Sequence, residues 1–162
     1  MKKNNYRRTL FIFLFCVFFM GASYFYVQHF FPVPSQREVA YSYDLDGDSA
    51  VFIIEEVETE CRFLGIDTPE KDTEMGIEAA AYTKNALRNA KEIVLELDPA
   101  SDKYDKYGRY LAWVWLDGEL LQYKLVEEGY AEIKYIYGNY KYMDKLYSLQ
   151  NEAKANKKGI WK

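Results

Sequence analysis

The amino-acid sequence predicts a small barrel of the α+β class built around one hydrophobic core. The first observation is a series of short stretches that alternate like β-strands, with helical stretches between them. The second is the composition, because 18% of the 162 residues are aromatic, sixteen of them tyrosines. A chain of this length forms one domain, or one domain with an appendage, and the sequence contains no internal repeat.

The strands are expected where β-branched and aromatic residues alternate between turn signals. Asp46-Gly47-Asp48-Ser49 is such a turn, and Pro69 ends the third strand because it cannot donate to a ladder. The expected strands are residues 39–45, 50–57, 60–66, 92–97 and 109–116, and residues 131–137 are expected to be extended.

Three helices are expected between and after these strands. Residues 75–90 are rich in alanine and contain no proline, so they favour a helix. Residues 120–128 form a shorter helix that ends at Gly129, which occupies the C′ position typical of glycine. Residues 142–156 form a final amphipathic helix.

The N-terminal segment is expected to lie in a membrane. No charged residue occurs between Arg8 and Arg37, and residues 10–27 are long and apolar enough for a transmembrane helix. The residues before the apolar run include basic side chains and no acidic ones, so the positive-inside rule places the short N-terminus in the cytoplasm and the rest of the chain outside the cell. The predicted division is therefore an anchor and linker, residues 1–36, followed by a soluble domain, residues 37–162.

A cleaved signal peptide is the alternative to this anchor. The apolar run is long for a signal peptide, and the best small-residue site, near Ala22, has Met20 at its −3 position. Cys16 follows Phe15 where a lipoprotein signal needs a small residue. These features favour an uncleaved anchor, and cleavage would give a secreted protein. Cys16 lies in this run and Cys61 in an expected strand, so we predict no disulfide.

The charge and the rare residues exclude several chemistries. With one His in the chain, Ser-His-Asp and Cys-His catalysis are disfavoured, and two Cys cannot form a Cys-rich zinc site. The first 36 residues carry four basic and no acidic side chains, so the remainder has 17 basic against 25 acidic groups, a net charge of −8. Taken alone, this acidic balance argues against a polyanionic partner.

Carboxylates and arginines occur at the ends of the expected strands. Carboxylates in such positions can bind a hard divalent cation, and arginine suits bidentate contact with phosphate. Each residue alone also fits an ordinary role in a turn, a helix N-terminus or a surface ion pair. The significance lies in their joint occurrence, in order, along one chain. The residues are Asp48, Asp67, Glu70 and Asp105, together with Arg62 and Arg109.

The chain from about Val39 to Trp161 resembles the staphylococcal nuclease (thermonuclease-like) family. Residues 62–70 (RFLGIDTPE) are similar to the first active-site block of the family, and residues 105–111 (DKYGRYL) to the second. Gly47-Asp48-Ser49 matches the metal-binding turn, with Asp48 fourteen positions before Arg62. Residues 125–131 and the closing Gly159-Ile160-Trp161 also match.

The resemblance implies an OB-type five-stranded barrel with three helices, and a calcium-dependent phosphodiesterase that hydrolyses DNA and RNA to 3′-phosphate products. It further implies that the ligands of Ca²⁺ are the carboxylates of Asp48 and Asp67 and the backbone carbonyl of Thr68. The implied roles of the remaining residues are to hold the scissile phosphate (Arg62 and Arg109), to orient or deprotonate water (Glu70), and to line the nucleotide pocket (Lys106, Tyr107, Tyr135 and Tyr137).

Two departures from the family pattern affect substrate binding. Only residues 71–74 separate Glu70 from the following helix, whereas the family usually has a longer, lysine-bearing loop there. The acidic domain also lacks the positive charge from which a nuclease gains affinity. We expect the protein to be a monomer. We also expect it to prefer single-stranded nucleic acid, because tyrosine rings can stack on bases of any sequence. The rival hypotheses are a binding module that has lost catalysis and a surface interaction protein on the same fold.

Overall fold

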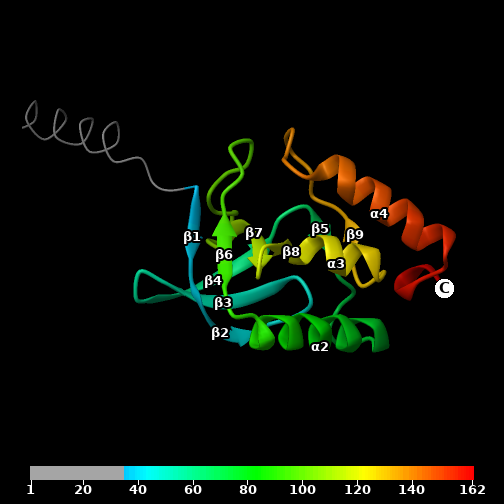
Figure 1. The fold of residues 1–162 in the computed structure, drawn as a ribbon, viewed down its shortest axis with the longest axis horizontal. Coiled ribbons are helices and arrows are strands. Elements are labelled where there is room, and N and C mark those ends of the chain that lie inside the picture. Colours follow the sequence, from blue (N-terminus) through cyan, green and yellow to red (C-terminus); the bar gives the residue numbers. More distant parts are fainter. Residues whose placement is uncertain (1–34) are drawn as a thin grey trace, which may run out of the picture. The chain divides into compact units, whose positions relative to one another are not determined.

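In the computed structural model, which describes residues 35–162, the strands form one large sheet and one small sheet (Figure 1). The large sheet has the strand order β1-β6-β7-β4-β3-β2, and β8 pairs with β7. The small sheet pairs β5 with β9. Neighbouring strands are antiparallel except for β4 and β7, which are parallel. The strands are β1 (Gln36–Glu38), β2 (Ala40–Asp44), β3 (Ser49–Ile54), β4 (Val57–Phe63), β5 (Ile66–Asp67), β6 (Ile93–Glu96), β7 (Tyr110–Leu116), β8 (Glu119–Leu120) and β9 (Glu132–Ile133).

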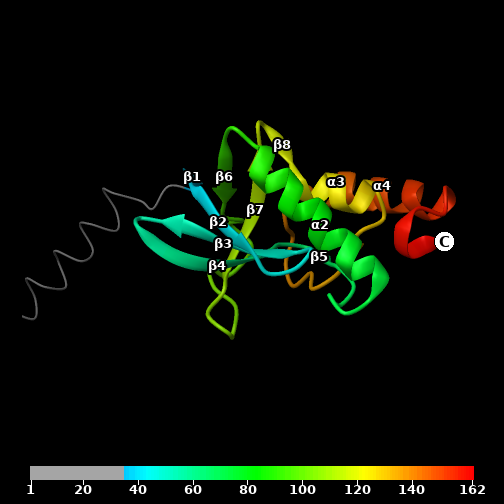
Figure 2. The same ribbon diagram turned by 90° about the horizontal axis from the view of Figure 1, so that it is seen from below.

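The helices lie beside the large sheet. α2 (Glu74–Asn89) packs against β2, while α3 (Leu121–Glu127) contacts β7, α2 and α4 (Met143–Ala155). Figures 1 and 2 show α3 and α4 running side by side, with the chain ending beyond them in the short 3₁₀ helix η1 (Gly159–Trp161). The expected end of the short helix is confirmed, since Gly129 follows the C-cap with a φ of 74°.

The β3–β4 hairpin differs from the sequence prediction. Residues 50–57 were expected to form one strand, but Glu55 and Glu56 form a tight turn with φ values of 51° and 68°. Ile54 and Val57 face each other directly across that turn. The prediction was wrong because this left-handed turn normally carries Asn or Gly, and no such residue marks it in this sequence.

The hydrophobic core is one cluster of buried side chains from the large sheet and the helices. Its fully buried side chains come from β3, β6, β7, α3 and α4, and they include Phe52, Leu95, Trp113, Leu125 and Leu146, all 0% exposed. Cys61 is also fully buried and free, as expected of a small hydrophobic side chain.

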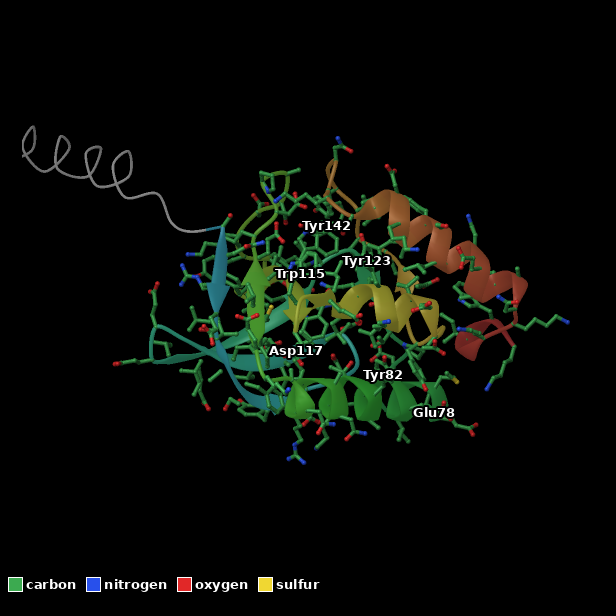
Figure 3. All side chains as sticks on the ribbon, in the orientation of Figure 1. Glu78, Tyr82, Trp115, Asp117, Tyr123 and Tyr142 are labelled. Atoms are coloured by element: carbon green, nitrogen blue, oxygen red, sulfur yellow. The ribbon has the colours of Figure 1, made fainter. Side chains whose placement is uncertain are left out.

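An aromatic cluster joins the start of α4 to the sheet. The ring of Tyr142 packs edge-on against Trp113, Trp115 and Tyr123, with centroid distances of 5.4, 5.4 and 6.4 Å. Three of these rings are labelled in Figure 3. The Tyr142 hydroxyl also donates to the buried carboxylate of Glu96 at 2.8 Å. This cluster fixes the chain segment that leads from β9 to α4 against β6 and β7.

α2 supports the turn that precedes β3. The hydroxyl of Thr83, which is 0% exposed, donates to the carbonyl of Gly47 at 2.6 Å. A Cβ atom at Gly47 would lie 2.9 Å from the Cβ of Ala79, so the turn lies directly on the helix surface. The conformation of the turn is thereby set by helix residues far from it in the sequence, with Thr83 36 positions after Gly47.

The α+β class with three α-helices is confirmed for residues 35–162, and the large sheet is mostly open. Its closure into a five-stranded OB-type barrel remains a prediction. The expected transmembrane run, residues 10–27, lies outside the described residues. Within residues 35–162, no helix combines the length and apolar character that a membrane crossing requires.

Gly76 provides a test of how α2 holds the loop that follows β5. A Cβ atom at this position would overlap the carbonyl oxygen of Glu70. Gly76→Ala should therefore lower the free energy of unfolding by about 1–3 kcal/mol, although alanine is the better helix former by about 1 kcal/mol.

Urea denaturation measures this change, and Asn85→Ala on the exposed face of the same helix is the control. The control should gain a few tenths of a kcal/mol from helix propensity alone, about 0.5 kcal/mol at most. A Gly76→Ala variant that is more stable than the wild type would contradict the close packing of this loop.

Candidate active site

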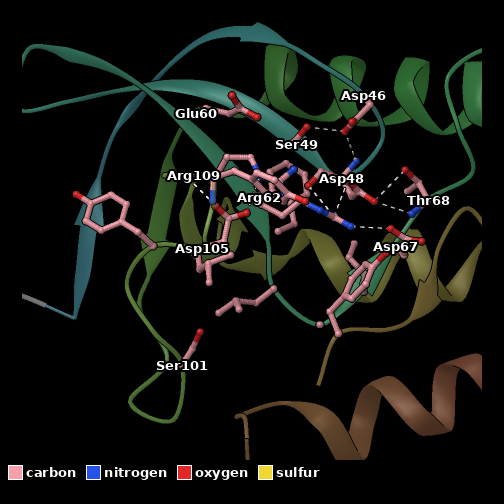
Figure 4. A pocket seen from close by; sticks show the side chains of 18 of the residues that line it. Asp46, Asp48, Ser49, Glu60, Arg62, Asp67, Thr68, Ser101, Asp105 and Arg109 are labelled. Carbon is pink, nitrogen blue, oxygen red and sulfur yellow. Dashed lines mark hydrogen bonds and ion pairs between the residues drawn. The ribbon is translucent and has the colours of Figure 1, made fainter. Parts of the chain in front are cut away.

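A cleft of about 1170 Å³ opens on one side of the sheet. Its walls come from the turn before β3, strand β4, the loop after β5, the loop before β7 and the segment after β9. Figure 4 shows several of the polar side chains pointing into it. All the residues selected from the sequence line this cleft: Asp48, Arg62, Asp67, Thr68, Glu70, Asp105, Lys106, Tyr107, Arg109, Tyr135 and Tyr137.

Asp48 is held in place by its own turn. The carboxylate of Asp46 accepts hydrogen bonds from the backbone N–H of Asp48 at 3.1 Å and from the hydroxyl of Ser49 at 2.7 Å. Oδ2 of Asp48 then accepts the backbone N–H of Thr68 at 2.6 Å and its hydroxyl at 3.1 Å. These bonds connect the turn before β3 to the end of β5.

The guanidinium of Arg62 links two carboxylates in the cleft. Its Nη1 lies 2.5 Å from Oδ1 of Asp48, and its Nη2 lies 2.7 Å from Oδ1 of Asp67. Nη1 also donates to the backbone carbonyl of Asp48 at 3.2 Å. The side chain is only 10% exposed. Arg62 reaches both partners because its β4 position is paired with Ser49 on β3, next to the Asp48 turn.

Burial raises the pKa of Asp48 to about 7, although the neighbouring Arg62 guanidinium acts to lower it. The residue is 4% exposed, so its charged form has lost most of its water. Nearby Asp46 raises the pKa further. A negative charge at this position is therefore costly, and additional positive charge in the cleft would stabilise it.

Lys134 is a neighbour of this cluster that the sequence analysis did not select. Its Nζ lies 2.9 Å from Oδ2 of Asp67 and 3.4 Å from Oε1 of Glu132. Its hydrogen bond to Asp67 raises the pKa of Lys134 above its ordinary value. Strand β9 pairs Glu132 with Asp67, and this pairing brings Lys134 to the site. The only signal in the sequence was its place in residues 131–137, which were expected to be extended. This expectation was wrong in part, because the strand β9 covers Glu132–Ile133 alone and Tyr135 has a left-handed φ of 59°.

Glu70 follows in the loop between β5 and α2. Its backbone carbonyl accepts the N–H of Thr73 at 3.0 Å and the hydroxyl of Thr73 at 2.7 Å, and Thr73 caps α2 by accepting from Gly76. The Glu70 side chain is exposed in the cleft. Among residues 35–162 no hydrogen bond or ion pair engages its carboxylate, so it is available to a water molecule or a substrate.

Arg109 reaches the cleft from a hairpin loop that Asp105 organises. Oδ1 of Asp105 accepts the backbone N–H groups of Tyr107 and Arg109, both at 2.9 Å. Oδ2 accepts from Nε of Arg109 at 2.7 Å. Because this ion pair uses Nε, the two terminal nitrogens of the guanidinium have no partner within the described part of the chain. They can bind a bidentate anion such as phosphate.

The predicted nucleotide-contacting residues lie at the rim. Tyr107, Tyr135 and Tyr137 are 72%, 49% and 83% exposed. The Arg109 guanidinium lies 5.5 Å from the ring centroid of Tyr107, and the Arg62 guanidinium lies 5.8 Å from that of Tyr135. The exposed Lys106 packs over Tyr107 at 4.9 Å. Exposed aromatic rings beside cations are the surfaces on which nucleic-acid bases stack.

The donor set fits a hard divalent cation. Asp48, Asp67 and Thr68 provide oxygen atoms alone, as Ca²⁺ and Mg²⁺ prefer. The two carboxylates converge on one guanidinium, and burial raises the pKa of Asp48, so a bound cation would stabilise its charged form. No cluster of three or more His, Cys, Asp or Glu side chains suited to a metal occurs in residues 35–162, so backbone and water oxygens would complete the coordination.

The family follows from comparison with known proteins. The staphylococcal nuclease homologue model matches residues 60–162. A thermonuclease from Staphylococcus hyicus is 38% identical over 123 residues, which cover 72% of this chain and 71% of that protein. The endonuclease YncB of Bacillus subtilis strain 168 is 37% identical over 124 residues, 72% of this chain and 58% of that protein. The chain belongs to the staphylococcal nuclease family, and these similarities support a hydrolytic nuclease.

The two arginines should differ in their effect on stability. Arg62→Gln leaves the Asp48 carboxylate buried without its cation, so the free energy of unfolding should fall by about 3 kcal/mol. Arg109→Gln breaks a more exposed pair, in which Asp105 keeps its backbone hydrogen bonds, and should cost no more than about 1 kcal/mol. Urea denaturation of both variants checks this difference, and equal losses would contradict the structural role of Arg62.

Proposed function

We propose that this protein is a calcium-dependent phosphodiesterase that hydrolyses DNA and RNA to 3′-phosphate products. The observation that carries the proposal is the convergence, in one cleft, of two arginines, two carboxylates and the unengaged carboxylate of Glu70. Family membership and the thermonuclease and endonuclease names of the relatives support the same activity.

The cation would be held by the carboxylates of Asp48 and Asp67 and by the backbone carbonyl of Thr68. When bound, Ca²⁺ neutralises charge on the phosphate and on the buried Asp48 carboxylate. Arg62 holds the carboxylates of Asp48 and Asp67 close together, so both could reach one cation once it replaces some of their present partners.

The two guanidinium groups would bind the scissile phosphate. Their hydrogen bonds strengthen as negative charge builds on the phosphoryl oxygens, which lowers the barrier to attack. Arg109 presents two terminal nitrogens for this contact, whereas Arg62 is more deeply buried and also holds the carboxylates.

Glu70 would act on the attacking water. Its carboxylate can accept a proton from water at hydrogen-bond distance or simply orient the molecule. In-line attack on phosphorus then breaks the bond to the 5′-oxygen, which takes up a proton as it leaves, and the phosphate stays on the 3′-oxygen. The capped turn at Thr73 keeps Glu70 at the edge of the cleft.

We infer that single-stranded DNA and RNA are the preferred substrates. Exposed Tyr107, Tyr135 and Tyr137 offer ring faces that can stack on unpaired bases of any sequence. Because residues 37–162 carry a net charge of −8, binding should depend on the local arginines and the cation rather than on a basic surface.

We also propose that the large sheet forms a closed, five-stranded barrel of the OB type. Its two edge strands, β1 and β2, are separated by Val39 alone, so one stretch of chain borders both β6 and β3. The N–H of Val39 donates to the carbonyl of Ile93 at 2.9 Å, which continues the β1–β6 pairing up to the start of β2.

The proposed location is the outer face of the cell membrane, with residues 10–27 as a single-pass anchor and a monomeric nuclease domain outside. Support comes from the basic residues before the apolar run and from the length of that run. Removal of the anchor by proteolysis would release the same domain as a secreted enzyme.

Cleavage of single-stranded DNA tests the catalytic roles. Residues 35–162, the described fold including β1, should cleave with Ca²⁺ and lose activity with a chelator. Glu70→Gln and Arg109→Ala should each lower kcat by about 10²–10³-fold, because each removes a contact made in the transition state.

The matched controls are exposed residues outside the cleft, Glu78→Gln on α2 and Lys145→Ala on α4. Both should cleave like the wild type. Equal rates for the wild type and both cleft variants would disprove this mechanism, and a pure wild-type domain inactive at low salt would favour the binding module.

Protease added to intact cells tests the orientation. If the domain lies outside the membrane, external protease should remove a C-terminal epitope tag while a cytoplasmic marker protein remains intact. Protection of the tag until the cells are lysed would contradict the proposed topology.

A further inference from the structure

Each oxygen of the Asp67 carboxylate is paired with a different cation. Oδ1 lies 2.7 Å from Nη2 of Arg62, and Oδ2 lies 2.9 Å from Nζ of Lys134. Figure 4 shows Asp67 joined to Arg62 on the cleft side. Asp67 is also a proposed ligand of the divalent cation, so Lys134 occupies an oxygen atom that the cation needs.

The Lys134 ammonium has an alternative to its contact with Asp67. Its side chain is 45% exposed, and Glu132 offers a second partner at 3.4 Å. The backbone of Lys134 is fixed independently, because its N–H donates to the carbonyl of Gly65 at 3.1 Å and β9 pairs with β5. The side chain can therefore leave Asp67 without unfolding the strand and without burying a charge.

We propose that Lys134 is an internal competitor of the divalent cation at Asp67 and sets the cation concentration at which the enzyme becomes active. The inference rests on the proposed function, since it takes Asp48 and Asp67 as cation ligands. In this arrangement Lys134 binds Asp67 in the absence of the cation and moves toward Glu132 or solvent when the cation binds.

The charges of the site support this role. Two carboxylates, Asp48 and Asp67, contact two cationic groups, so the formal charge of the cluster is zero with Lys134 in place and −1 without it. An ammonium close to a divalent cation repels it, and Lys134 must give up its bond to Oδ2 before that oxygen can coordinate. Both effects weaken cation binding, and at a half-exposed site they should together amount to about tenfold in affinity.

Calorimetric titration of the full-length protein with CaCl₂ tests the proposal, using Lys134→Gln, Lys134→Arg and Lys84→Gln. The Lys84 variant is a closely matched control because Lys84 pairs with Asp44 at 3.1 Å with similar exposure, 40% and 24% against 45% and 23%. It removes the same charge from a Lys–Asp pair outside the residues that line the cleft. Loss of either exposed pair should cost at most about 1 kcal/mol of stability, so both variants should fold.

Lys134→Gln should lower the Kd for Ca²⁺ about tenfold, and Lys84→Gln and Lys134→Arg should change it less than twofold. The Ca²⁺ concentration that gives half-maximal cleavage should fall by the same factor in Lys134→Gln. An unchanged Kd in Lys134→Gln, with a wild type that binds Ca²⁺ and cleaves DNA, would overturn the role of Lys134 and leave the proposed function intact. A wild type that neither binds Ca²⁺ nor cleaves would overturn both.

Discussion

The rest of the site depends on the two ion pairs that the buried Arg62 guanidinium forms. Arg62 contacts Asp48 in the turn before β3 and Asp67 in β5, and it extends from β4. Without it, two carboxylates would share a poorly hydrated cleft, and the pKa of Asp48 is already raised to about 7 by burial. The two carboxylates and the one guanidinium have a formal charge of −1, which Lys134 balances at Asp67, and in our proposal a divalent cation takes the place of Lys134.

Some residues around the cleft hold its loops in position, and others remain exposed where they can contact a substrate. Thr83 on α2 holds the turn that contains Asp48 through its hydrogen bond to the Gly47 carbonyl. Asp105 accepts the backbone N–H of Arg109 and so shapes the loop that carries Arg109. The carboxylate of buried Asp98 accepts hydrogen bonds from the indole N–H of Trp113 and from the backbone N–H of Lys141. These bonds connect the segment after β9 to the sheet. The groups that would meet substrate, Glu70 and the rim tyrosines, remain exposed.

Net charge and local charge give opposite indications in this protein. The acidic balance of residues 37–162 argues against a polyanionic substrate, yet two arginines and a proposed cation site line one cleft. Short-range contacts in a partly buried cleft are weakly screened, whereas distant surface charges are screened strongly by salt. The local arrangement therefore decides what can bind, and the overall charge decides mainly how strongly binding depends on salt and on the cation.

The sequence by itself determined the α+β class, the order of the helices and the Gly129 stop, because helix signals are local. Motif spacing also selected candidate site residues, and the structure places these in the cleft. It missed the Glu55-Glu56 turn, which lacks the usual glycine. Only the tertiary structure decided that Lys134 binds Asp67 and that Arg62 joins two carboxylates, since these contacts depend on strand register between distant segments. Burial likewise has no local signature, and it is burial that raises the pKa of Asp48.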